Sequence, residues 1–130
     1  MALLVTMVIS ACGTSETGPL ALVDATGDMA RNEGTVVITD ACIFLERGGE
    51  RGLLVWPADR TRWNEGDRTI SFSTLDGAEV TVESGQQVVL AGGGAGAGED
   101  GEDWTETIQW ARRPAPECAA DGAWFVTDVE

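Results

Sequence analysis

Cysteines, tryptophans and carboxylates are the side chains of this chain that could do chemistry. The 130 residues contain no histidine, tyrosine or lysine, and all eight basic residues are arginines. A Ser-His-Asp triad, a Cys-His dyad and a Schiff-base lysine are therefore impossible. Hydrolysis by a carboxylate pair is the one metal-free enzyme class that remains, and the 22 acidic residues single out no such pair. We expect no enzyme, and the alternative is a small secreted hydrolase that uses acidic residues.

The densest acidic segment follows the glycine-rich run Gly92–Gly98. Asp100, Glu102 and Asp103 could gather a weakly held calcium ion, which takes about six to eight oxygen ligands, but their spacing is not that of an EF-hand. The same acids would repel a phosphate from the glycines. We therefore expect a flexible, solvated loop over 92–103, with no metal and no cofactor.

The net charge of −14 excludes several classes of partner. Nucleic-acid binding needs clustered lysine or arginine, so we expect no nucleic acid. Adhesion to anionic lipid headgroups is disfavoured for the same reason. A protein, a glycan or a cationic molecule remains as the partner, and charge repulsion between copies favours a monomer.

The apolar run Ala2–Ile9 ends at Ser10-Ala11-Cys12. As a helix, the segment up to Ala11 spans about 15 Å, half of a hydrocarbon core of about 30 Å. A short apolar segment with small residues before a cysteine resembles the signal peptide of bacterial lipoproteins. The resemblance implies cleavage before Cys12, a diacylglycerol on its sulfur, and anchorage to the extracytoplasmic face of the cell membrane by acyl chains. The alternative is a buried N-terminal strand with an incidental cysteine.

Cys42 and Cys118 remain as a pair once Cys12 is acylated. An even pair in an oxidising compartment favours a disulfide. Such a bridge would close a loop of about 75 residues, worth at most about 4–5 kcal/mol. Two buried thiols or a metal site are the alternatives, and without histidine the pair makes a poor zinc site.

Five tryptophans are many for one small domain. Trp56 and Trp124 lie in apolar stretches, and we expect them to pack in the core. Trp63 and Trp104 are flanked by charged residues, so we expect them to be exposed as candidate contacts for a sugar ring or a peptide. Packing is the alternative for both.

The elements that must position these side chains are mostly strands. Val, Ile and Phe enrichment and turn residues predict strands at Thr35–Glu46, with a bend at Asp40-Ala41, and at Leu53–Trp56, Gln87–Ala91 and Trp124–Val129. Arg47–Gly52 is the expected hairpin loop. Asp24–Asn32 is the one segment that could form a helical turn, and Gly27 weakens it.

A second hairpin is predicted with its register. Ile70 and Phe72 on one side, and Val80 and Val82 on the other, alternate with polar residues. A three-residue loop, Leu75-Asp76-Gly77, pairs Phe72 with Val80 and Ile70 with Val82, which keeps the apolar side chains on one face.

Short strands at close spacing predict an all-β fold, a small antiparallel barrel or sandwich, with the five-stranded oligonucleotide/oligosaccharide-binding (OB) barrel as the nearest known shape. The expected organisation is a signal peptide at 1–11, an acylated tether and irregular segment at 12–33, and a β-domain at 34–130.

Four stretches also resemble small uncharacterised lipoproteins of high-GC Gram-positive bacteria; they are Ala41–Leu45, Leu54–Pro57, Gly85–Gly93 and Pro116–Cys118. The resemblance runs from about Gly34 to Val129 and implies a secreted β-domain with a Cys42–Cys118 bridge, but no activity. We therefore expect a lipid-anchored, non-enzymatic binding or envelope-maintenance module. Any ligand should touch the barrel end that carries Gly92–Asp103, with Trp104 as the aromatic contact.

Overall fold

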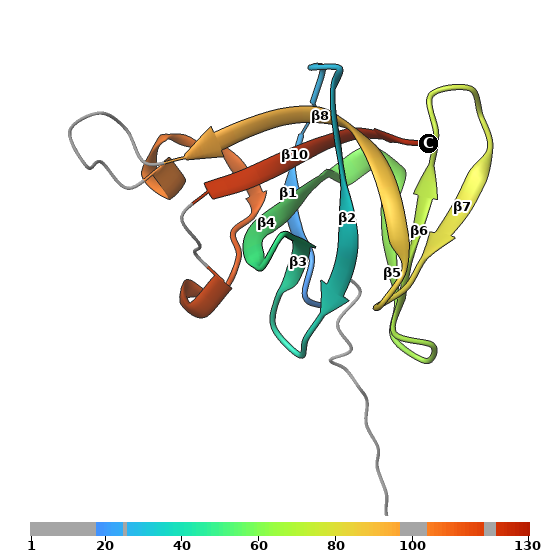
Figure 1. Cartoon of the computed structure of the whole chain (residues 1–130), viewed down its shortest axis with the longest axis horizontal. Helices are drawn as coiled ribbons and strands as arrows, with labels where there is room; N and C mark the ends of the chain where they lie inside the picture. The colour runs from blue at the N-terminus through green and yellow to red at the C-terminus, as the bar shows by residue number, and fades with distance from the viewer. Residues whose placement is uncertain (1–17, 25, 97–103, 119–121) are drawn as a thin grey trace, which may run out of the picture.

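Strands dominate the computed structural model, which describes residues 18–24, 26–96, 104–118 and 122–130 (Figure 1). The strands are β1 (Ala21–Val23), β2 (Ala30–Ile38), β3 (Ile43–Arg47), β4 (Glu50–Pro57), β5 (Thr61–Asn64), β6 (Thr69–Ser73), β7 (Glu79–Val82), β8 (Gln87–Gly96), β9 (Trp110–Arg112) and β10 (Gly122–Val129). Three short 3₁₀ helices, η1 (Ala58–Arg60), η2 (Trp104–Thr107) and η3 (Pro116–Cys118), complete the elements. No helix in these ranges is long and apolar enough to span a membrane. The predicted all-β class is confirmed.

Five of the strands close into a barrel. Hydrogen bonding runs in the order β10-β8-β2-β3-β4, and β4 then pairs with β10 to complete the ring. This closing pair is parallel, with Leu53 opposite Ala123 and Val55 opposite Phe125, whereas the other barrel pairs are antiparallel. The same strand order, with a parallel closing pair, characterises the OB barrel. The predicted small barrel is confirmed.

A three-stranded sheet, β5-β6-β7, covers one end of this barrel. Its inward side chains, Trp63, Ile70, Phe72 and Val82, join the same apolar cluster as the barrel interior. The ring of Phe72 meets that of Trp56 on β4 edge-on, with 5.7 Å between centroids. We call these four side chains the plug, because they close the barrel interior at this end.

The β6–β7 hairpin of the plug has the predicted register. Phe72 lies opposite Val80, and Ile70 lies opposite Val82. The turn closes with a hydrogen bond from the Thr74 amide to the Ala78 carbonyl, and Gly77 has a φ of 93°, which favours glycine.

A second apolar cluster lies on the outer face of the barrel. Leu53 and Val55 of β4 face outward there and pack with Ala21, Ala123 and the Cys42–Cys118 pair, which forms a disulfide. The two halves of β4 are covered by different neighbours, because β10 pairs with Leu53–Val55 and β1 with Val55–Pro57. The predicted disulfide therefore fastens η3 to the segment between β2 and β3.

The glycine-rich run is where the expected loop is wrong. Gly92–Gly96 continues β8 and pairs along its length with β10, from Gly96 opposite Gly122 to Gly92 opposite Val126. A Cβ atom on Gly92 would lie 2.0 Å from the carbonyl oxygen of Phe125. Glycine is needed here because two backbones meet closely, so Gly92–Gly96 is barrel wall and not a solvated loop. The rest of the predicted loop, 97–103, lies outside the described residues.

Other expected boundaries also shift. β2 begins at Ala30 and β1 occupies Ala21–Val23, so the segment 12–33 is not irregular throughout, and its described part contains no helix. The loop expected at Arg47–Gly52 shrinks to Gly48-Gly49, both with positive φ, because Arg47 pairs with Glu50. The predicted break near Asp40-Ala41 is confirmed, since β2 ends at Ile38 and β3 begins at Ile43.

A candidate binding site at the open end of the barrel

Along β2 and β3, the barrel interior changes from apolar to polar side chains. On β3, the inward side chains are Ile43, Leu45 and then Arg47, since side chains on a strand alternate between its two faces. On β2, the same face carries Val36, Gly34 and then Asn32. The interior is therefore apolar at the plug and polar at the opposite end of these two strands.

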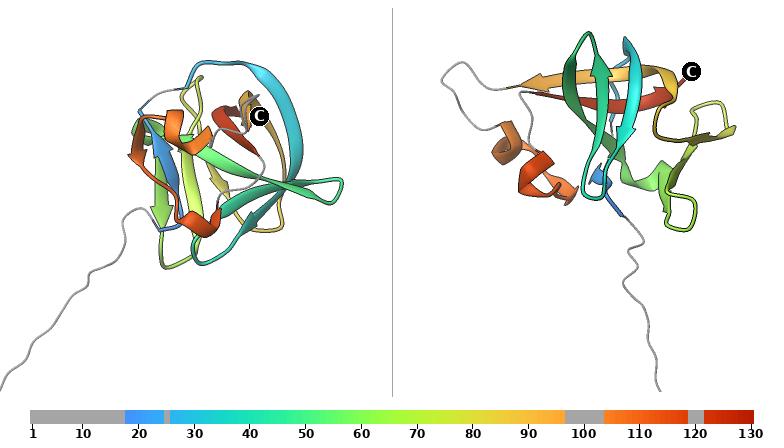
Figure 2. Two further views of the ribbon diagram at one scale, coloured as in Figure 1. Left: turned by 90° about the vertical axis from the view of Figure 1, so that its left-hand side faces the viewer. Right: turned by 60° about the horizontal axis from the view of Figure 1, so that its bottom comes forward.

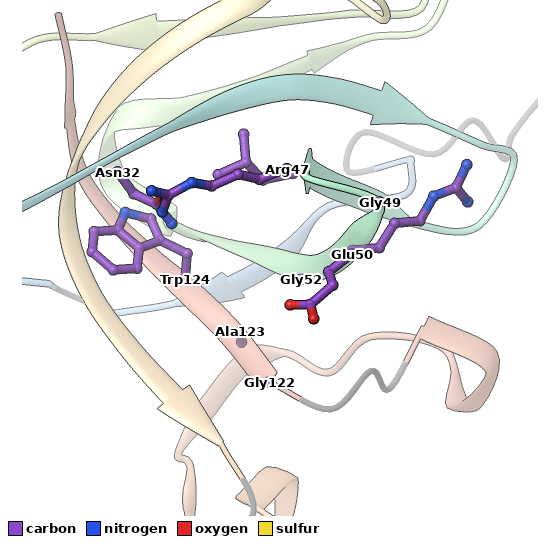
Figure 3. A pocket seen from close by; sticks show the side chains of 10 residues that line it. Asn32, Arg47, Gly49, Glu50, Gly52, Gly122, Ala123 and Trp124 are labelled. Carbon is purple, nitrogen blue, oxygen red and sulfur yellow. The ribbon is translucent and has the colours of Figure 1, made fainter.

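A hollow of about 710 Å³ opens at this polar end (Figure 3). We call it the mouth. Its lining consists of Asn32, Leu45, Arg47, Gly49, Glu50, Arg51, Gly52, Gly122, Ala123 and Trp124. The β3–β4 hairpin supplies most of one wall, and the start of β10 supplies the other. Figure 2 shows this hairpin and the three-stranded sheet on different sides of the barrel.

Trp124 is the aromatic side chain of the mouth. The residue is half-buried, and the face of its indole is turned toward the opening in Figure 3. Gly94 on β8 leaves space beside the ring, because a Cβ there would lie 3.6 Å from it. Nε1 is buried and has no hydrogen-bond acceptor among the described residues. The ring is therefore fixed between two strands with one face accessible.

Arg47 reaches across the mouth. Its Nη1 donates to Oδ1 of Asn32 at 2.8 Å, and the same oxygen accepts from the Glu33 amide at 2.9 Å. Arg51 turns instead to Glu46, with 3.0 Å between Nε and Oε2. The mouth thus combines an aromatic face, a guanidinium, an amide and several glycine backbones, which is a set that holds small polar ligands.

The exposure expected for Trp63 is wrong. This side chain is only 6% exposed and belongs to the plug, and its Nε1 donates to Oε1 of Glu65 at 2.6 Å. Its neighbours Arg62 and Asn64 are polar because adjacent residues on a strand face opposite ways, so flanking charge says nothing of the residue between them.

Trp104 begins η2, but its side chain lies outside the described residues, so its predicted exposure stays a prediction. Trp56 is fully buried, as expected. Trp124, expected in the core, packs against it but also lines the mouth. The sequence feature that indicates this position is the small residues around Trp124, namely Gly122-Ala123 before it and the glycines of β8 beside it. They leave space for a large ring at the end of the barrel.

Several other predicted site residues fall outside the described ranges. Cys12 and the acids Asp100, Glu102 and Asp103 are among them, so lipidation and weak calcium binding stay predictions. Within the described ranges, no group of three or more His, Cys, Asp or Glu could hold a metal ion.

No Asp or Glu side chain among the described residues is buried. Its buried polar side chains are four threonines, at 61, 74, 105 and 127. One carboxyl has a shifted pKa: the Thr74 hydroxyl and the Ala78 amide hold the pKa of Asp76 below its usual value. Asp76 sits in the β6–β7 turn and not in the mouth.

No protein-family model, curated protein or solved structure matches this chain.

Proposed function

We propose that this chain is a lipid-anchored, non-enzymatic domain of the bacterial cell envelope that binds a small polar ligand in its mouth. The observation that carries this proposal is the difference between the two barrel ends. One end is filled by the plug, whereas the other leaves the face of Trp124 open beside Arg47 and Asn32. A volume of about 710 Å³ lies in the range of ligand sites.

The outer face of the barrel supports the mouth as the site. OB barrels commonly bind along the face of their second and third strands, which here are β3 and β4. In this chain, outward side chains of both strands, Phe44, Leu53 and Val55, pack under residues of β1, β9 and η3. The chain itself therefore occupies much of the surface that a ligand would use elsewhere.

The position of Gly18 indicates which way an anchored domain would face. Gly18, the first described residue, lies against Trp63 in the plug, since a Cβ on it would clash with that indole. A tether from Cys12 would join the domain at the plugged end. The mouth would then face away from the membrane, toward soluble ligands. Gly96 pairs with the lining residue Gly122, so Gly92–Gly96, the described part of the region where we expected ligand contact, reaches the mouth end of the barrel.

The anchor and the site have separate tests. Cys12→Ser should release the domain from membranes in a detergent phase separation, with Cys42→Ser as the control that stays bound. Equal partition of Cys12→Ser and the parent refutes the anchor.

For the site, ¹⁵N–¹H spectra of the domain should be titrated with single sugars, amino acids and small carboxylates. Shifts at Gly49, Gly122 and the Trp124 indole are expected, and shifts confined to other surfaces, or none anywhere, contradict the proposal.

A further inference from the structure

Arg47 differs from the other arginines of this acidic chain. Ion pairs with carboxylates hold five of the eight, namely Arg31, Arg51, Arg62, Arg68 and Arg113. Arg60 and Arg112 donate to backbone carbonyls, of Ser73 and Thr127 and of Leu20. Arg47 alone donates to a neutral side chain, that of Asn32, and has no carboxylate partner among the described residues.

A carboxylate was within easy reach of Arg47. Glu50 lies directly opposite it in the β3–β4 register, and opposite charges at such positions usually pair. Figure 3 shows the Glu50 carboxylate on the Gly122 side of the mouth and the Arg47 guanidinium beside Asn32 on the opposite side. The positive charge of Arg47 therefore lies at the hollow without a counter-charge among the described residues.

The groups around this charge are hydrogen-bond donors. Arg47 donates one N–H group of its guanidinium to Asn32, and the other N–H groups are not used in that hydrogen bond. Oδ1 of Asn32 accepts two hydrogen bonds, and its amide nitrogen has no acceptor in the described part of the chain. A guanidinium and an amide N–H₂ side by side match the two oxygens of a carboxylate, and charge-assisted bonds of this kind are the strong ones.

We infer that the mouth binds a small monocarboxylate that carries a flat ring, with the carboxylate on Arg47 and Asn32 and the ring on the face of Trp124. This inference rests on the proposed function and adds the ligand class. Aromatic faces attract flat rings. A single negative charge fits one guanidinium, whereas Glu50 in the lining and the net charge of −14 repel dianions.

Benzoate, benzamide and phenylphosphate test this class, because they share a ring and differ in charge. The readout is the ¹⁵N–¹H signal of the Trp124 indole, identified by its loss in Trp124→Phe. We expect saturable shifts with benzoate. Benzamide should bind roughly tenfold or more weakly, because it lacks the charge-assisted hydrogen bond. Phenylphosphate should also bind more weakly than benzoate, because the acidic surroundings repel a dianion.

Arg47→Gln and Arg62→Gln form the matched pair of variants. Each removes one exposed positive charge, but Arg62 lies on β5, outside the mouth, and is paired with Glu79. Benzoate affinity should fall roughly tenfold or more in Arg47→Gln and stay within about twofold in Arg62→Gln. Unfolding curves would show that both variants are folded.

Three results would overturn the inference: no benzoate shift in the parent, equal affinity for benzamide, or unchanged benzoate affinity in Arg47→Gln. Equal shifts with benzamide leave the mouth as a binding site and remove only the ligand class. Absence of mouth shifts across these probes and the wider panel of sugars and amino acids removes the proposed function as well.

Discussion

The two ends of the barrel use the same kind of side chain in opposite ways. At the plugged end, Trp63 and Phe72 project from the sheet inserted between β4 and β8 and are buried against the barrel interior. At the mouth, Trp124 rises from the barrel wall beside glycines and keeps one face open. An aromatic side chain of this barrel is thus buried where another layer of the chain covers it, and partly exposed where none of the described residues does. Stability should depend on the first end, and recognition on the second.

Removal of one aromatic ring from the plug should cause the largest loss of stability. Phe72 is fully buried, so Phe72→Ala should lower the free energy of unfolding by about 3–5 kcal/mol. Arg47→Gln at the mouth should change it by less than about 0.5 kcal/mol. Urea unfolding measures both, and similar losses from the two variants would mean that the mouth is also a stability element.

The disulfide gives the next effect, because it fastens the outer layer and not the plug. Replacing Cys42 and Cys118 together by serine should cost about 2–5 kcal/mol, given the sequence separation of 76 residues. The measurement is urea unfolding of the parent and the double variant without reductant. Thiol labelling of the denatured parent is the control, and two free thiols in the exported protein would contradict the bridge.

Two glycines of β8 in the mouth wall differ in how closely β10 approaches them. A Cβ on Gly92 would lie 2.0 Å from the Phe125 carbonyl and 2.8 Å from Nε1 of Trp124, whereas one on Gly94 would be 3.6 Å from the nearest ring atom. Gly92→Ala should therefore cost about 1–3 kcal/mol. Gly94→Ala is the matched control and should be nearly neutral. Equal stability of the two variants in thermal unfolding would argue against this close contact.

The smallest expected effect concerns pH at the plug hairpin. Because Thr74 and Ala78 hold the pKa of Asp76 below its unfolded value, the carboxylate stabilises the fold at pH values above that unfolded value, about 3.9. This contribution is lost as the pH falls through the folded pKa. Asp76→Asn should therefore be less stable than the parent at neutral pH, with the difference shrinking below about pH 4. A difference that is constant with pH would contradict the charge as its source.

Local signals in the sequence predicted the local structure well. The β6–β7 register followed from alternation and turn chemistry, and the cysteine pair followed from its even count. The mouth could not be predicted, because Asn32, Arg47 and Trp124 are far apart in sequence and meet only when the barrel closes. Gly92–Gly96 was misleading for a related reason: a glycine run reads as a loop unless the opposing backbone, here that of β10, is known.

The parallel pair that closes the barrel has a consequence for how the protein is made. In chain order β10 follows all other barrel strands, and it must pair with β4 and β8 together. Until Gly122–Val129 has been synthesised, and exported if the domain is secreted, both of those strands have bare edges that could template aggregation. Non-local pairing of this kind also folds slowly. The emerging chain is therefore most vulnerable in the interval before its last strand arrives, and a chain truncated before Gly122 would stay in that state.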